Sequence, residues 1–256
     1  MTSAVNTLDD VGVCHQAASL LLAYPDQQLL DRLPLLREAV GATPWASHFD
    51  AVLAHLEGQS LVESQTFHVA EFDTSRRHAL HLSYWTDGDT RRRGEVLAGI
   101  KQVYRDSGLL VQLDGELPDH LPLVLEFAAI GDPERGRALL QRYRASLELL
   151  RLQLVKDELP HAGVLEAVCA TLPGDSPTSR AEVQKMYDAA MPSETVGLDG
   201  YGDGPLTTER RAPEMLGMPT IPTPSAAEPI TTTAEPVEAP RPSLFSRLTG
   251  RSKEKK

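Results

Sequence analysis

"DPERGRALLQRYRASLELLRLQLVKDE", residues 132–158, is the stretch that decides the fold class. Asp132 followed by Pro133 is typical of a helix start, because aspartate caps free backbone N–H groups and proline is tolerated in the first helical turn. Apolar side chains then recur at the three- and four-residue spacing of one helix face, namely Leu139, Leu140, Tyr143, Leu147, Leu150 and Leu154. The stretch therefore predicts a long amphipathic helix with one buried face.

The same spacing recurs along most of the first 190 residues, and strand-like alternation is nearly absent. We expect further helices over residues 7–24, 25–40, 44–58, 60–72, 75–86, 88–108, 160–173 and 176–190, with another following Asp119. Thr7 is expected to cap the first helix, Pro34 to interrupt the second, and Ser60 with Glu63 to form a capping box. The sequence predicts an all-α bundle of about eight or nine helices.

The composition changes near residue 192. The segment from Leu198 to Lys256 contains 9 of the 19 prolines and few large apolar residues, so it cannot offset the entropy of ordering. We therefore expect a helical domain over residues 1–192 and a disordered, proline-rich tail over 193–256. The tail from Leu198 has equal numbers of acidic and basic residues, so the net charge of −11 belongs to the helical part.

This charge disfavours nucleic acid and anionic membranes as partners, because both require a surplus of Lys and Arg. A cationic partner is favoured instead. The N-terminus lacks the basic and apolar regions of a secretion signal, and no apolar stretch is long enough to span a bilayer, so we expect no stable membrane insertion and a cytoplasmic protein. Cys14 and Cys169 lie inside apolar helical patterns and are expected to be buried free thiols.

Motifs for catalysis are missing from the sequence. It contains no lysine-bearing phosphate loop, no dinucleotide fingerprint and no H-E-x-x-H or C-x-x-C metal motif. His78 and His81 could share a helix face, but without a clear third ligand they favour solvated surface over a metal site. Arg91, Arg92 and Arg93 follow a Gly-Asp-Thr helix start that could hold an anion, so a nucleotide- or anion-binding switch remains the alternative function. We expect no enzyme.

"ELPDHLPLVLEF", residues 116–127, contains an Asp-His pair between two prolines. Catalysis would require a third group, and neighbouring residues on a helix point about 100° apart. One interpretation is that Asp119 caps the following helix, with Pro122 in its first turn. The other is that Asp119, His120 and Glu126 are exposed and contact a ligand.

The segment from His68 to Ala129 closely resembles the nitrate reductase assembly chaperones of the NarJ type, within the TorD-like group. The resemblance is carried by "YWTDGDTRRRG", residues 84–94, and by "ELPDHLPLVLEF". It implies an all-helical cytoplasmic chaperone that is not a subunit of the finished enzyme. Its client would be the catalytic subunit of respiratory nitrate reductase, with molybdenum cofactor biosynthesis proteins as possible further partners.

The resemblance also implies the mode of action. The chaperone would keep its client competent for insertion of the molybdenum cofactor, delay membrane docking until then, and bind no cofactor stably itself. Recognition would include the basic, apolar N-terminus of the client, and a groove with apolar lining and carboxylates at its rim would suit such a peptide. The candidate peptide-binding residues are Glu71, Phe72, Asp73, Leu82, Tyr84, Trp85, Asp119, His120, Leu123 and Glu126. For the aromatic residues among them, core packing is the alternative.

The end of the tail, "RPSLFSRLTGRSKEKK", is basic and has Leu244, Phe245 and Leu248 at helical spacing. It resembles in charge and pattern the peptide that the groove should bind, so it could compete in cis or contact anionic lipid. A solubilising, unstructured end is the simpler interpretation.

Overall fold

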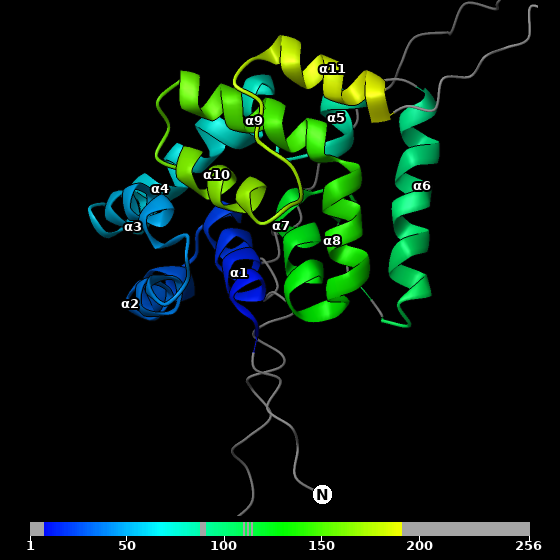
Figure 1. Cartoon of the computed structure of the whole chain (residues 1–256). Helices are drawn as coiled ribbons and strands as arrows, with labels where there is room; N and C mark the ends of the chain where they lie inside the picture. Colours follow the sequence, from blue (N-terminus) through cyan, green and yellow to red (C-terminus); the bar gives the residue numbers. More distant parts are fainter. Residues whose placement is uncertain (1–7, 88–90, 110, 112, 114, 191–256) are drawn as a thin grey trace, which may run out of the picture. The chain divides into compact units, whose positions relative to one another are not determined.

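The computed structural model describes residues 8–87, 91–109, 111, 113 and 115–190, and this part of the chain is helical (Figure 1). Its α-helices are α1 (Asp10–Leu22), α2 (Gln27–Gly41), α3 (Asp50–Glu57), α4 (Leu61–His68), α5 (Leu82–Asp87), α6 (Arg91–Asp106), α7 (Leu121–Glu126), α8 (Pro133–Arg142), α9 (Arg144–Lys156), α10 (Ala162–Ala170) and α11 (Arg180–Ala190). Two 3₁₀ turns, η1 (Ala46–Phe49) and η3 (Arg76–His78), and two π turns, η2 (Val69–Asp73) and η4 (Phe127–Gly131), join some of them. The predicted all-α class is confirmed.

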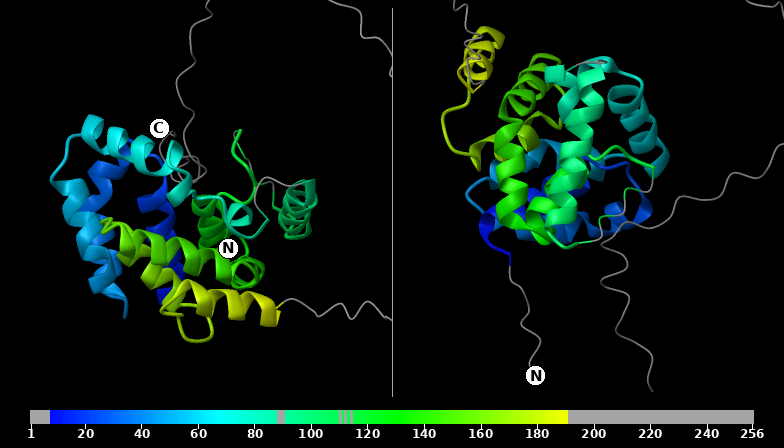
Figure 2. Two further views of the ribbon diagram at one scale, coloured as in Figure 1. Left: turned by 90° about the horizontal axis from the view of Figure 1, so that it is seen from above. Right: turned by 90° about the vertical axis from the view of Figure 1, so that its right-hand side faces the viewer.

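Helix α1 lies at the centre of the core, in contact with α2, α7, η4 and α10 (Figure 1). The core side chains come mainly from α1, α7, α9 and α10, among them Leu21, Leu22, Leu121, Leu125, Leu147, Leu154, Val164 and Val168. The hydroxyl of Ser19 on α1 donates a hydrogen bond to the carbonyl of Pro122 at 2.7 Å. This bond fixes α7 against α1 at the start of α7. Figure 2 shows α11 along the outer side of α9, which it contacts.

Several predicted helix ends are confirmed. Ser60 and Glu63 form the expected capping box, and Asp132 caps α8 with Pro133 in its first turn. Gly108 follows α6 with a φ of +73°, a conformation that favours glycine. Cys14 and Cys169 are buried free thiols. The predicted cap Thr7 lies outside the described residues, and Asp9 caps α1 instead.

Two helix predictions were wrong in their continuity. The stretch that predicted one long helix forms α8 and α9, which meet at Tyr143, where φ is −100° and ψ is 23°. The apolar spacing did not signal this bend because both halves have the same period. Conversely, α2 runs through Pro34 without interruption. Leu33 and Leu36 are buried beside it, and this packing offsets the hydrogen bond that proline removes.

The prediction of one helix over residues 75–86 was also wrong. A 3₁₀ turn, η3, is followed by an extended segment in which His81 forms an antiparallel bridge with His120, and α5 begins only at Leu82. His78 and His81 therefore do not share a helix face. No helix in the described part of the chain is long and apolar enough to cross a membrane. The tail and its Leu244 segment lie outside the described residues, so the predicted boundary at residue 192 stays a prediction.

Candidate functional site

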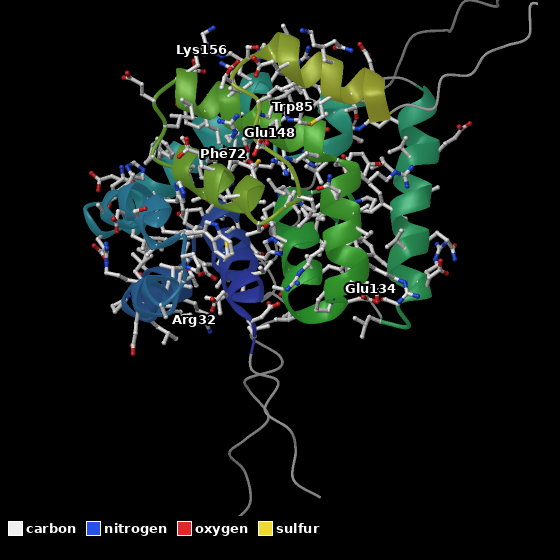
Figure 3. All side chains as sticks on the ribbon, in the orientation of Figure 1. Arg32, Phe72, Trp85, Glu134, Glu148 and Lys156 are labelled. Atoms are coloured by element: carbon white, nitrogen blue, oxygen red, sulfur yellow. The ribbon has the colours of Figure 1, made fainter. Side chains whose placement is uncertain are left out.

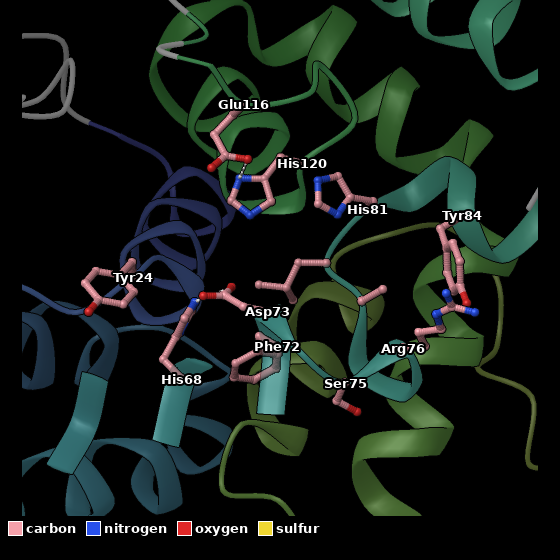
Figure 4. A pocket seen from close by; sticks show the side chains of 12 residues that line it. Tyr24, His68, Phe72, Asp73, Ser75, Arg76, His81, Tyr84, Glu116 and His120 are labelled. Atoms are coloured by element: carbon pink, nitrogen blue, oxygen red, sulfur yellow. Dashed lines mark ion pairs between the residues drawn. The ribbon is translucent and has the colours of Figure 1, made fainter. Parts of the chain in front are cut away.

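A cavity of about 450 Å³ lies between the end of α1, the α4–η2 segment, the extended segment before α5 and the segment before α7 (Figure 4). Twelve residues line it: Tyr24, His68, Phe72, Asp73, Ser75, Arg76, Ala79, Leu80, His81, Tyr84, Glu116 and His120. Aromatic and imidazole rings belong to six of the twelve, and charged groups stand at the cavity edge. A cavity of this size can hold a side chain together with part of its peptide backbone.

One wall is formed by the π turn η2. The Thr74 N–H donates to the carbonyl of Val69, five residues earlier, at 3.0 Å, so this turn is wider than an α-helical turn. It places Phe72, only 5% exposed, in the floor of the cavity and leaves the Asp73 side chain 55% exposed at the edge. π turns are frequent at functional sites because they change the direction of side chains within a helix.

The opposite wall is formed by the bridge between His81 and His120. The Leu82 N–H donates to the Asp119 carbonyl at 3.1 Å, and the Leu121 N–H donates to the Leu80 carbonyl at 2.7 Å. The two imidazole rings lie with their centroids 5.3 Å apart. Two segments 39 residues apart in sequence are thus held side by side at the cavity.

Asp119 does not stand at the rim, and it does not cap α7; both expectations were wrong. Its side chain is fully buried, and Oδ2 accepts hydrogen bonds from the backbone N–H of Ser83 at 3.0 Å and from the Ser83 hydroxyl at 2.6 Å. Arg93 Nη2 lies 3.8 Å from the same oxygen, and Arg93 Nε donates to the Ser83 hydroxyl. Asp119 therefore stabilises the start of α5, because the carboxylate satisfies a free N–H group of that helix's first turn.

The backbone around Asp119 is fixed from a second side. The Tyr104 hydroxyl donates to the Pro118 carbonyl at 2.7 Å, and Tyr104 is buried against the ring of Phe127. Helix α6 thus holds the segment before α7 through both Arg93 and Tyr104. This network positions His120 without exposing Asp119.

The titratable groups of the cavity have an unusual environment. Burial lowers the pKa of His68 and lowers that of His120 to about 3, so both imidazoles are neutral at pH 7. His68 Nε2 lies 3.8 Å from an Asp73 oxygen, and His120 Nδ1 lies 3.9 Å from a Glu116 oxygen. The carboxylates are near the rings but beyond hydrogen-bonding distance. The cavity edge therefore carries two exposed carboxylates with Arg76 as a counter-charge.

Of the ten residues that the sequence predicted, Phe72, Asp73, Tyr84 and His120 line the cavity together. The prediction missed six polar or charged lining residues, namely Tyr24, His68, Ser75, Arg76, His81 and Glu116. Glu116 stands in the same motif as His120, so the motif could have identified it. Tyr24 could not have been found from sequence, because it comes from the distant end of α1.

The other predicted residues lie elsewhere. Leu82 belongs to the buried core, Leu123 packs partly against it, and burial raises the pKa of the half-buried Glu126. The Trp85 indole N–H donates to the Ala79 carbonyl, and its ring lines a smaller hollow of about 90 Å³ beside α9 and α11. Any binding role for these residues remains a prediction.

Glu71 is occupied by a different partner. Its carboxylate lies 3.2 Å from Nδ1 of the buried His78, whose Nε2 lies 2.8 Å from an Asp157 oxygen. The His78 ring is thus held between two carboxylates in the interior. The expectation that His78 lies on the solvated surface was wrong. Within the described residues, no group of three or more His, Cys, Asp or Glu side chains is arranged to hold a metal ion.

The helical arrangement is shared with a solved structure. A putative redox enzyme maturation protein from Archaeoglobus fulgidus aligns with a TM-score of 0.51 and 21% sequence identity, over 66% of this chain and 98% of the other. The chain thus has the helical fold of that protein, and this likeness concerns the fold alone.

Sequence comparison gives the family. Residues 36–165 match the family model described as nitrate reductase delta subunit, which is just over half of the chain, and the chain belongs to this family. The resemblance found in the sequence is thereby confirmed. A probable nitrate reductase molybdenum cofactor assembly chaperone, NarJ of Bacillus subtilis, is 32% identical over 66% of this chain and 92% of its own length.

A second relative is much longer than this chain. The nitrate reductase-like protein NarX of Mycobacterium tuberculosis is 39% identical over 167 residues, which is 62% of this chain but only 24% of the relative. This chain therefore spans about a quarter of that relative's length.

Proposed function

We propose that this protein is a dedicated chaperone for the catalytic subunit of nitrate reductase. It would keep the subunit competent to accept its molybdenum cofactor and would delay docking on the membrane until insertion is complete. The observation that carries the proposal is the family match over residues 36–165, which includes every cavity-lining residue except Tyr24. The name of the Bacillus subtilis relative, matched along nearly all of its length, supports the same role.

The cavity is the proposed contact for a basic and apolar segment of the client. Phe72 and Leu80 offer apolar surface, while Asp73 and Glu116 place negative charge at the edge. A segment that buries an apolar side chain and keeps a cation at the edge would match both properties. The net charge of −11 would raise the association rate with such a segment, most strongly at low ionic strength.

In this proposal the molybdenum cofactor is cargo of the client and not a resident group of the chaperone. The purified chaperone is then expected to carry no stoichiometric molybdenum, which elemental analysis measures directly. The chaperone would act in the cytoplasm, before the client reaches the membrane, and cell fractionation tests that location. No chemical step is assigned to the protein.

Co-expression with the catalytic subunit tests the proposal. A tagged full-length chain should retain the subunit when it lacks the cofactor and release it after insertion. In cells without the chaperone, the subunit should accumulate with a low molybdenum content. Insertion of the molybdenum cofactor into the subunit at the normal rate in such cells would contradict the proposal.

A nucleotide- or anion-binding switch is the alternative. Residues 88–90 of its proposed site lie outside the described residues, while Arg93 contacts Ser83 and Asp119 in the interior. Because Arg93 makes these contacts, it is less available to bind an anionic ligand. Calorimetry with nucleoside triphosphates and a hydrolysis assay on the full chain would separate the two functions, because the chaperone should show no turnover.

A further inference from the structure

Four polar side chains line the part of the cavity away from Arg76, namely His68, Asp73, Glu116 and His120, which we call the cavity cluster (Figure 4). The His68 side chain is only 8% exposed, yet its ring forms no hydrogen bond with any residue that the structure describes. Its nearest carboxylate oxygen, on Asp73, lies 3.8 Å away. An imidazole that faces the cavity and has no partner among the described residues is available to a ligand bound there, so this group points to a ligand with a hydrogen-bonding group.

Aromatic rings surround the same part of the cavity. The Tyr24 ring meets that of His68 edge to face with centroids 5.5 Å apart, and the His68 ring meets that of Phe72 at 5.1 Å. Aromatic rings attract cations to their faces, and the exposed carboxylates of Asp73 and Glu116 add negative charge at the edge. A site made of rings and carboxylates therefore suits a planar cation better than it suits an aliphatic side chain.

We propose that the cavity cluster binds the guanidinium group of one arginine side chain in the client segment; this rests on the proposed function. A guanidinium has five N–H donors in a plane, so it can donate to both carboxylates and to the unpartnered nitrogen of His68 while stacking on a ring. Lysine has a compact, strongly hydrated ammonium group that cannot stack in this way. The cluster therefore discriminates between two side chains of equal charge.

Arg76 gives the cavity a direction. Figure 4 shows Arg76 and Tyr84 on the right-hand side, while Tyr24 and His68 lie on the left and Glu116 above. A second cation near Arg76 would be repelled, so the arginine is bound at the Tyr24 end. Removing the charge of Arg76 should consequently strengthen the binding of a cation, which is opposite to the effect of removing a carboxylate.

The test uses small probes and does not require the client. The full-length chain is titrated with N-acetyl-L-arginine amide, and the ring resonances of His68 and His120 are followed by NMR. The lysine analogue and the neutral isostere citrulline are titrated in parallel. The arginine probe should saturate and bind several-fold more tightly than the lysine probe, and citrulline should cause no saturable shift. Equal shifts with arginine and citrulline would overturn the inference.

Variants then test the assignment of residues. Asp73→Asn and Glu116→Gln should each weaken the arginine probe by about two- to fivefold, the range for exposed ion pairs, and Arg76→Gln should tighten it by about twofold. Glu134→Gln is the matched control, because Glu134 is an exposed carboxylate on α8, far from Phe72 in Figure 3. A uniform loss of binding in all four variants would contradict the inference, since only a specific cation site predicts opposite signs.

The client experiment separates this inference from the proposed function. If the chaperone retains the catalytic subunit but the arginine probe does not bind, the inference is wrong and the proposed function stands. If the probe binds with the predicted sign pattern but the subunit is never retained, the site is supported and the proposed function is wrong.

Discussion

Two groups of polar side chains, both close to the core, are built in opposite ways. In the first, the fully buried Glu148 accepts hydrogen bonds from Arg144 Nε at 2.8 Å, Arg151 Nε at 2.6 Å and the Ser176 hydroxyl at 2.8 Å (Figure 3). In the second, the cavity cluster, the ring-to-carboxylate distances are 3.8 and 3.9 Å. We call the first group the Glu148 cluster.

The difference concerns what each group can still bind. Both oxygens of Glu148 are occupied, and Arg144 and Arg151 also donate to the carbonyls of Pro173, Gly174 and Pro177. The Glu148 cluster thereby holds the segment that leads to α11 against α9. The cavity cluster keeps its donors and acceptors free at an open surface. A saturated polar network stabilises the fold, whereas an unsaturated one at a cavity is available to a ligand.

The largest effect is expected from breaking the Glu148 cluster. Glu148→Ala leaves the buried Arg144 and the partly buried Arg151 without their carboxylate, so the free energy of unfolding should fall by about 3–5 kcal/mol. Urea denaturation followed by circular dichroism measures this. Asp188→Asn, at an exposed position on α11, is the control and should change the value by less than about 0.5 kcal/mol. If Glu148→Ala lowered the free energy of unfolding by no more than the control does, the cluster would not stabilise the fold.

A smaller loss is expected at Asp119, which is buried in a polar network next to the cavity residue His120. Asp119→Asn removes the charge near Arg93 and weakens the bonds to Ser83, so unfolding should become easier by about 2 kcal/mol. The His120 ring resonance should shift as well, because the bridge to His81 depends on this segment. An unchanged melting temperature would show that Asp119 is dispensable for the start of α5.

Acid should destabilise the fold through its buried histidines. Burial lowers the pKa of His161 to about 3 and that of His15 to about 4, whereas the unfolded chain takes up these protons near pH 6.5. The unfolded state therefore binds more protons below pH 6.5, and stability present above that pH is lost as the pH falls toward these folded-state values. Between pH 7 and 5.5 each histidine should contribute a loss of roughly 1 kcal/mol.

Urea titrations at the two pH values measure this loss. His161→Gln should have a smaller pH dependence than the parent chain, whatever its stability at pH 7. An unchanged slope would exclude His161 as a source of the acid sensitivity.

The smallest effect on stability is expected in the cavity cluster. Asp73→Asn combined with Glu116→Gln should change the free energy of unfolding by less than about 0.5 kcal/mol, because both side chains are more than half exposed and form no short contact with the rings. The same double variant should weaken the arginine probe by roughly tenfold. A large loss of stability would contradict the contrast between the two clusters.

Local sequence signals predicted much of the fold. Ser60, Asp132 and Gly108 marked helix ends because capping depends on a few neighbouring residues. The bend at Tyr143 and the extended segment at His81 were missed, since both depend on partners distant in sequence. Asp119 was misplaced for the same reason: a short polar residue before a helix caps that helix by default, and only the bridge carries it to α5 instead.

The sequence by itself determined the helical class, the family and four of the residues that line the cavity. Apolar periodicity, caps and family motifs are properties of short segments, so they can be recognised without a structure. The tertiary structure alone decided which polar groups are satisfied and which face a cavity. That distinction depends on distances between α1, η2 and the bridge, and those are fixed by packing between segments that the chain order keeps far apart.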